Sequence, residues 1–146
     1  MTAFANRRLF VQGLLLAAFT GAAQAQADEP VAIVQRIFET YAKDGIPRVP
    51  WSPAVAARIK RERLEADPIL EAQDTDVKGF AVREVSRGAD RAVVEANFTS
   101  FNRKMRSQFD FRLVDGKWVI GNYRILAGVE FTPTDFRRSL KMPPLN

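Results

Sequence analysis

The side chains of this 146-residue chain that could take part in catalysis are few, because the sequence has neither His nor Cys. Without Cys there are no disulfides, no thiol redox chemistry and no Cys-ligated zinc. Without His, the usual general base at neutral pH is missing, and so are the Ser-His-Asp and Cys-His nucleophile systems. Carboxylates, lysines and phenols remain. No oxygen-ligand spacing of the Asp-x-Asp-x-Asp-Gly kind occurs, so we predict neither a metal site nor a cofactor.

Two acidic residues and two phenols are the candidates for acid/base chemistry. Asp74 and Asp76 stand two positions apart, and a close pair of carboxylates can raise the pKa of one of them. The same pair equally suits a polar loop that leads into a strand. Tyr41 and Tyr123 are the only phenols, and Tyr41 falls on the apolar stripe of a predicted helix, which favours packing. Asp74, Tyr41 or Tyr123 with Arg124 would be the set of a pocket enzyme of the isomerase or dehydratase type.

Asn122, Arg124 and Tyr41 are the candidates for ligand binding. Along an uninterrupted strand, Asn122 and Arg124 follow Trp118 and Ile120 on the apolar face. An Arg at the rim of an apolar pocket can hold a carboxylate or phosphate through paired hydrogen bonds. The sequence therefore predicts an anion-binding position near the end of this strand.

Two alternatives to that anion site stay open. Arg124 can instead form a structural salt bridge, for example with Glu39 of the first predicted helix. Gly121 can mark a β-bulge, which would shift the alternation of the strand and move its last residues to the other face.

Trp51, between two proline-containing segments, suits either a partner anchor or a lid on the core.

Two amphipathic helices are predicted first along the chain. Apolar residues at helical spacing occupy 31–43, with Pro30 at the start. Ser52-Pro53 reads as an N-cap followed by Pro at the first helical position, which begins a second helix. Asp67-Pro68 ends that region, since the residue before a proline avoids helical backbone angles.

From residue 77 the apolar period changes from helical to two. Asp115-Gly116 is the signal of a two-residue hairpin, and it pairs Leu113 with Trp118 and Phe111 with Ile120. One side of the sheet is then strongly apolar, so both helices are expected to pack on it. We predict one α+β domain over 28–146, with two N-terminal helices on a four-stranded antiparallel meander. The predicted strands are 77–86, 90–101, 106–114 and 117–126.

Residues 1–27 have the zones of a secretory signal peptide. Their only charges are the pair Arg7-Arg8, an apolar run follows over 9–19, and Ala-x-Ala occurs twice, ending at Ala25 and at Ala27. The apolar run is shorter than the roughly 20 residues that a membrane span needs. We therefore predict an exported, periplasmic protein whose mature chain has no membrane anchor.

The overall charge is mildly basic, with 22 Lys and Arg against 17 Asp and Glu and a formal net charge of +5. Nucleic-acid-binding proteins concentrate a larger excess on one face, so we predict no nucleic-acid partner. With so few catalytic side chains, the sequence favours a non-enzymatic domain that binds an unknown small molecule or another envelope protein. The pocket enzyme and a homodimer are the alternatives left open.

Two helices followed by a curved antiparallel meander that ends in Trp-x-Ile are similar to the nuclear-transport-factor-2-like superfamily, a cone-shaped α+β fold. A narrower resemblance, over most of the mature chain, is to the exported bacterial family catalogued as domain of unknown function 3828. It implies a periplasmic protein or lipoprotein without an assigned activity. This chain lacks the lipid-attachment Cys and has Gly121-Asn122 where acidic residues often stand. The motifs that carry the narrower resemblance are 66–74 and 117–120, with Arg124, Leu126 and Gly128.

The segment 6–12, with Arg7-Arg8-Leu9-Phe10 at its centre, resembles the twin-arginine export motif. General secretion is the alternative route. Changing Arg7 and Arg8 both to Lys separates the two, because the twin-arginine receptor reads the guanidinium pair while a general signal needs only positive charge. Blocked export of the double variant would assign the twin-arginine route, and undiminished export would assign general secretion.

We expect the mature chain to begin at Asp28 or at Gln26, because small residues in the Ala-x-Ala pattern precede both positions. N-terminal sequencing of protein recovered from the periplasm measures this directly. Recovery of an intact chain beginning with Met1 from the membrane fraction would contradict the prediction.

Overall fold

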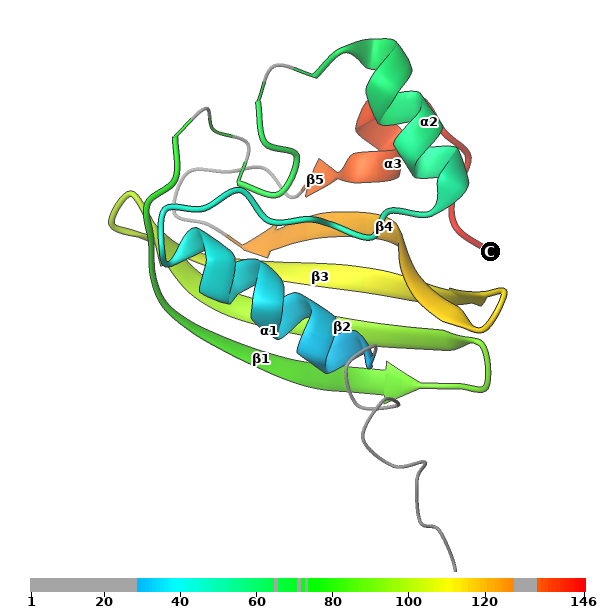
Figure 1. The fold of residues 1–146 in the computed structure, drawn as a ribbon, viewed down its shortest axis with the longest axis horizontal. Helices are drawn as coiled ribbons and strands as arrows, with labels where there is room; N and C mark the ends of the chain where they lie inside the picture. Colours follow the sequence, from blue (N-terminus) through cyan, green and yellow to red (C-terminus); the bar gives the residue numbers. More distant parts are fainter. Residues whose placement is uncertain (1–28, 65, 71, 73, 128–133) are drawn as a thin grey trace, which may run out of the picture.

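The computed structural model describes residues 29–64, 66–70, 72, 74–127 and 134–146, so the predicted signal peptide and Gly128 lie outside the described residues. The fold is α+β, as predicted, but its open antiparallel sheet has five strands instead of four, in the order β1-β2-β3-β4-β5 (Figure 1). None of the described helices has the length and apolar character that a membrane span requires. The elements are α1 (Pro30–Tyr41), α2 (Pro53–Glu62), β1 (Val77–Arg87), β2 (Arg91–Ser100), β3 (Arg103–Val114), β4 (Lys117–Ala127), β5 (Thr134–Asp135) and α3 (Phe136–Ser139).

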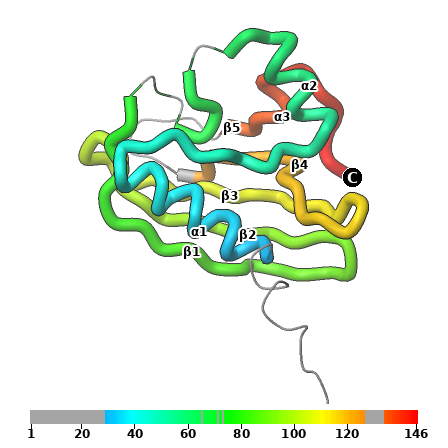
Figure 2. The backbone as a smooth tube through the Cα atoms, in the orientation of Figure 1, coloured from blue at the N-terminus to red at the C-terminus, as the bar shows by residue number. Residues whose placement is uncertain are grey.

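Helix α1 lies across one face of the sheet and supplies much of the core (Figures 1 and 2). Its apolar residues recur at helical spacing, and those from Ile33 to Tyr41 on this stripe are buried. The ring of Phe38 is central, because its centroid lies 4.7 Å from that of Phe98 and 6.2 Å from that of Phe109. The predicted helix over 31–43 is therefore confirmed within two residues at each end.

Helix α2 begins as predicted, since the Ser52 hydroxyl accepts a hydrogen bond from the Val55 N–H at 3.4 Å. Its predicted place on the sheet is wrong. It lies beyond β4, beside α3 (Figure 1), and its Arg58 Nε donates to the Leu140 carbonyl at 2.6 Å. The physical reason is that α2 has little apolar surface with which to pack on the sheet, and Val55 is its only fully buried residue.

The hairpin between β3 and β4 follows the predicted register. Asp115 and Gly116 have φ of 50° and 73°, as a type I′ turn requires, and Leu113 pairs with Trp118. A second pair with positive φ, Phe101 and Asn102, connects β2 to β3. Because that turn comes earlier than predicted, β3 begins at residue 103 instead of 106.

A β-bulge interrupts β4 at Gly121. Asp110 and Phe111 are consecutive in β3, yet they pair with Asn122 and Ile120, so Gly121 has no partner in β3. A Cβ atom at Gly121 would come within 2.9 Å of the Leu145 side chain. The C-terminal tail thus packs against the bulge, and the residue there has to be small.

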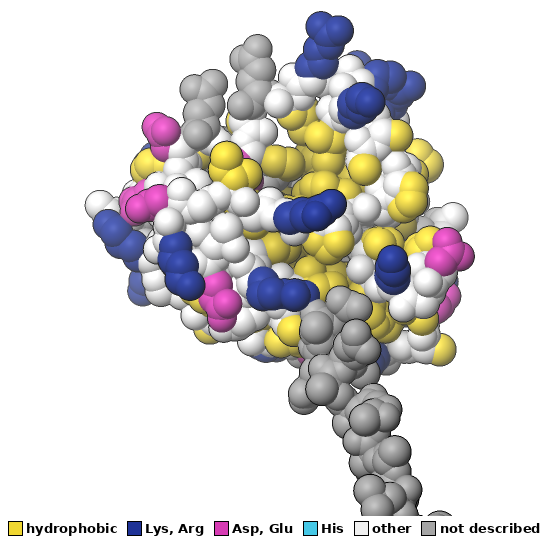
Figure 3. Space-filling view, viewed as in Figure 1, with side chains coloured by type: hydrophobic (Ala, Val, Ile, Leu, Met, Phe, Trp, Pro, Cys, Tyr) yellow, Lys and Arg dark blue, Asp and Glu magenta, His cyan; other side chains and the backbone are white. Residues whose placement is uncertain are grey.

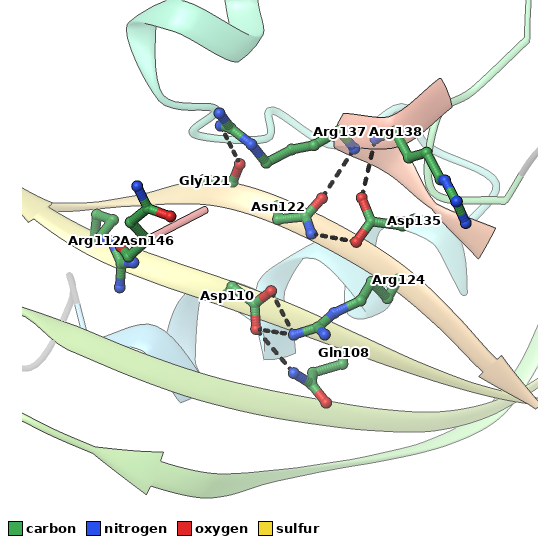
Figure 4. Close-up of polar contacts among 10 residues, drawn as sticks. All are labelled: Gln108, Asp110, Arg112, Gly121, Asn122, Arg124, Asp135, Arg137, Arg138 and Asn146. Carbon is green, nitrogen blue, oxygen red and sulfur yellow. Dashed lines mark hydrogen bonds and ion pairs between the residues drawn. The ribbon is translucent and has the colours of Figure 1, made fainter. Parts of the chain in front are cut away.

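The bulge shifts the side-chain alternation of β4 by one position, so the residues after Gly121 point to the opposite face from the one that simple alternation gives. Tyr123 and Ile125 are 1% exposed and belong to the core. Asn122 and Arg124 therefore lie on the opposite face of the sheet, away from α1 (Figure 4). Their predicted place on the apolar face is wrong, and the predicted alternative of a bulge at Gly121 is confirmed.

Two segments pair with the outer edge of β4, on either side of the bulge. The main chain of Ile120 accepts a hydrogen bond from the Ser52 N–H and donates one to the Pro50 carbonyl, each at 2.8 Å. Beyond the bulge, β5 pairs antiparallel with Arg124 and Ile125. The segment between α1 and α2 accordingly runs along the sheet edge beside β4 (Figure 2). Trp51, within that segment, is half-buried against the core, as the lid alternative proposed.

Two buried tyrosines hold the turn at 66–70 against the core. Both carboxylate oxygens of Asp67 accept from the Tyr41 hydroxyl at 2.8 Å, and Asp67 also accepts from the main-chain N–H groups of Ile69 and Leu70. The Tyr123 hydroxyl donates to the Ile69 carbonyl at 2.8 Å. Ile69 is 1% exposed, so this turn closes the core.

The Tyr41–Asp67 contact predicts a pH-dependent stability. Burial and the adjacent Asp67 carboxylate raise the pKa of Tyr41 above its usual value near 10. The contribution to stability is complete below pH 10 and is lost as the pH rises further, because only the unfolded chain then releases this proton. In Tyr41→Phe we expect the free energy of unfolding to fall less steeply above pH 10, by about 1.4 kcal/mol per pH unit. Urea titrations at several pH values measure this, and equal slopes in both proteins would contradict it.

Candidate functional site

A groove of about 710 Å³ opens between α1, segment 47–50 and the start of β4. The space-filling view shows this apolar hollow, with Lys and Arg side chains at its margin (Figure 3). Its volume is within the range of small-molecule sites. The apolar lining consists of Ile33, Ile37, Pro47, Pro50, Trp118 and Val119.

The groove exists because the chain leaves β4 at Pro50. The parallel pairing of Trp51 with Ile120 would continue toward Trp118 only if residue 50 donated a main-chain hydrogen bond, and proline has no N–H. The Trp51 N–H instead bonds to the Val49 carbonyl at 2.9 Å, which bends the chain. Pro47, Arg48 and Pro50 of this segment thus line the groove and form one wall.

The polar lining of the groove is cationic. Arg36, Arg48 and Lys117 line it together with Thr40, and no Asp or Glu is among the described residues of its lining. Arg48 and Lys117 are exposed, and neither forms an ion pair with a carboxylate in the described part of the chain. A negative group beside Arg48 or Lys117 would therefore meet attraction without competition from a described carboxylate of the lining.

Trp118 lines the groove from the apolar face of the sheet and is only half-buried, packed against the core. The Arg87 guanidinium lies 5.5 Å from the centre of the indole ring. Arg87 also binds Glu84 at 2.7 Å and Glu29, just before α1, at 2.6 Å. This network fixes the start of α1 and the indole relative to one another.

The three predicted ligand-binding residues do not line this groove. Tyr41 is in the core with its hydroxyl on Asp67. Asn122 is 4% exposed, donates to an Asp135 carboxylate oxygen at 2.9 Å and accepts from the Arg137 N–H at 3.0 Å. Its side chain thus ties α3 to the bulge (Figure 4).

Arg124 forms a structural ion pair, but with a different partner from the one predicted. Its guanidinium donates to both carboxylate oxygens of Asp110, on the neighbouring strand, at 2.7 and 2.8 Å. Gln108 donates to the same carboxylate at 2.8 Å (Figure 4). Glu39, the predicted partner, is on α1 and therefore on the other side of the sheet.

The residues named for a pocket enzyme are not brought together. Asp74 is exposed, and its neighbour Asp76 lies 3.5 Å from the Lys78 ammonium. The hydroxyls of Tyr41 and Tyr123 are bound inside the core, while Arg124 lies on the opposite face. Among the described residues, no group of three or more acidic side chains is gathered in a way that suits a metal ion.

A second, smaller cavity of about 370 Å³ lies where the β2–β3 hairpin meets Leu70 and Ala72. Its described lining is mostly apolar, with Phe98, Met105 and Ile125 among its members, and Arg103 is the only cation among these described residues. The larger groove combines apolar surface with three cations and is therefore the candidate functional site. Sequence reasoning missed it, although Pro47 and Pro50 on either side of a cation marked an irregular segment.

The Arg124–Asp110 pair predicts a loss of stability on substitution. Arg124→Leu leaves the largely buried Asp110 carboxylate without its ionic partner, which should lower the free energy of unfolding by about 1–2 kcal/mol. Denaturant titrations of Arg124→Leu, Asp110→Asn and the double variant should show that the two losses are not additive. Arg91→Leu, in an exposed pair with Asp90, is the control and should change stability less. Unchanged stability of Arg124→Leu would contradict the structural role.

Comparison of the chain with protein-family models, with curated proteins and with solved structures gave no match. The likeness to the nuclear-transport-factor-2-like superfamily and to domain of unknown function 3828 therefore stays a prediction. The groove between α1 and segment 47–50 is the feature from which a function has to be inferred.

Proposed function

We propose that this chain is a non-enzymatic binding domain, and that its ligand is an amphipathic anion held in the groove between α1 and segment 47–50. One observation carries the proposal: three cations and an apolar surface line the same groove, and no carboxylate is among the lining residues that the structure describes. Burial of apolar surface contributes about 25 cal/mol per Å², so the walls supply most of the affinity. The cations select the sign of the charge.

The side chains of the described lining support binding over catalysis. Among the described lining residues, the only hydroxyl is that of Thr40, which donates to the Arg36 carbonyl of its own helix at 2.7 Å. The described lining has no phenol and no carboxylate, so these residues offer no pair of acid and base. The cations can hold and orient an anion, which is what a binding domain requires.

The proposal includes the location and the relationships predicted from the sequence. The zones of residues 1–27 favour export to the periplasm. An open antiparallel sheet with a helix across one face is compatible with a nuclear-transport-factor-2-like domain of the 3828 type. The ligand is then either a small molecule of the periplasm or a segment of another envelope protein.

Anilinonaphthalene sulfonate, a fluorescent amphipathic anion, tests the proposal. We expect saturable binding to the chain and about tenfold weaker affinity for Arg48→Glu and for Lys117→Glu. Reversing a charge beside a bound anion replaces attraction with repulsion, together about 1.4 kcal/mol. Higher salt should reduce the difference between the proteins.

Lys60→Glu and Arg61→Glu are the matched controls, because both residues are exposed on α2 and line neither cavity. They change the net charge of the chain by the same amount as the groove variants. Equal loss of affinity in the controls, or no saturable binding by the unmodified chain, would overturn the proposal.

A further inference from the structure

The outer edge of β4 has main-chain groups that face the groove. Ile120 directs its N–H and C=O to this edge, where they bond to Pro50 and Ser52. Trp118 precedes it by two residues with no bulge between them. Because the direction of main-chain groups repeats every second residue along a strand, the N–H and C=O of Trp118 face the same edge.

Segment 47–50 does not satisfy these two groups. Pro50 has no N–H to donate to the Trp118 carbonyl. Among the described residues, no main-chain hydrogen bond joins Trp118 to this segment. Residues on both sides of the gap, Pro50 and Trp118 among them, line the groove. The groove therefore contains one donor and one acceptor of a strand edge, beside its cations and apolar walls.

We infer that the groove binds a short, extended acidic peptide, which pairs with β4 at Trp118. The inference rests on the proposed function and names the ligand class. A single peptide residue placed opposite Trp118 satisfies both main-chain groups, as in the addition of a strand to a sheet edge. An acyl chain with an anionic head offers no such donor and acceptor together, so the edge groups favour a peptide.

The strand geometry also fixes which peptide side chains suit the groove. The residue opposite Trp118 points to the same face as the indole, the face that α1 covers, where Ile33 and Ile37 form the wall. That position takes an apolar side chain. Its two neighbours point to the other face, which is the side of Lys117, so acidic side chains suit them.

The pairing available to the peptide is short. On one side of Trp118 the strand ends in the turn at Asp115-Gly116, and on the other side Ile120 is already paired. A peptide therefore engages one residue of β4, and three residues with the pattern acidic, apolar, acidic are sufficient. On the proposed location, the source is an exposed acidic segment of another envelope protein.

The test uses blocked tripeptides with the full exported chain. Acetyl-Glu-Leu-Glu-amide is the probe. The same peptide with an N-methyl group on its Leu lacks the N–H that would donate to the Trp118 carbonyl. Acetyl-Lys-Leu-Lys-amide reverses the charge of the two outer side chains. Titration calorimetry measures affinity, and NMR measures hydrogen exchange of the Trp118 amide. We expect the acidic peptide to bind, the N-methylated one to bind at least tenfold more weakly, and the Lys peptide not to bind. Exchange of the Trp118 amide should slow at least tenfold with the acidic peptide.

The variants and one further probe separate failure of this inference from failure of the proposed function. Lys117→Glu should weaken the acidic peptide about tenfold and Lys60→Glu should not. Equal affinity for the N-methylated peptide, or an unchanged exchange rate at Trp118, would overturn strand pairing while anilinonaphthalene sulfonate still binds. Binding of octanoate without binding of the acidic peptide would assign the groove to acyl anions and overturn the inference. If none of the anions binds, the proposed function fails as well.

Discussion

The main-chain N–H and C=O groups along the outer edge of β4 need hydrogen-bond partners. The positions of the elements beyond β1–β3 depend on which segments supply these partners. Segment 50–52 pairs with Ile120, and β5 pairs with Arg124 and Ile125. These two pairings place α2 and α3 next to each other beyond the sheet. An unpaired and buried main-chain group costs about as much as a lost hydrogen bond, so both pairings are strong constraints.

The bulge at Gly121 lies between the two pairings and couples them to the C-terminus. Arg137, 8% exposed, donates to the Gly121 carbonyl at 3.1 Å and to the Pro143 carbonyl at 2.7 Å. The Asn122 side chain accepts a hydrogen bond from the main-chain N–H of the same Arg137. The Leu145 side chain covers the glycine itself. The last ten residues of the chain thus fix the geometry of the bulge in β4, more than ten positions before them in the sequence.

Local chemistry explains which parts of this arrangement could be predicted from the sequence. Asp115-Gly116 determines its hairpin through its own backbone preferences, and α1 follows from the spacing of its apolar residues, so both were predicted correctly. The place of Arg124 depends on whether Gly121 bulges, and that depends on Leu145 and Arg137, which are distant in the chain. The groove depends on Pro50 lying beside β4, a tertiary relation for which the sequence has no local signal. For this reason the predicted site residues, Asn122, Arg124 and Tyr41, proved to be engaged in structural contacts.

The distribution of hydrogen-bonding groups distinguishes the groove from the rest of the molecule. In the core, the hydroxyls of Tyr41 and Tyr123 have acceptors, and on the outer face of the sheet Asp110 has two donors. In the groove, Arg48 and Lys117 bring positive charge, and the described lining has no carboxylate to balance it. The edge of β4 at Trp118 adds a main-chain donor and acceptor. In solvent these groups bond to water at little cost, since the groove is open. Their arrangement becomes an advantage when a ligand brings negative charge, apolar surface and a main-chain amide together, because each displaced water is then replaced by a partner of the matching kind.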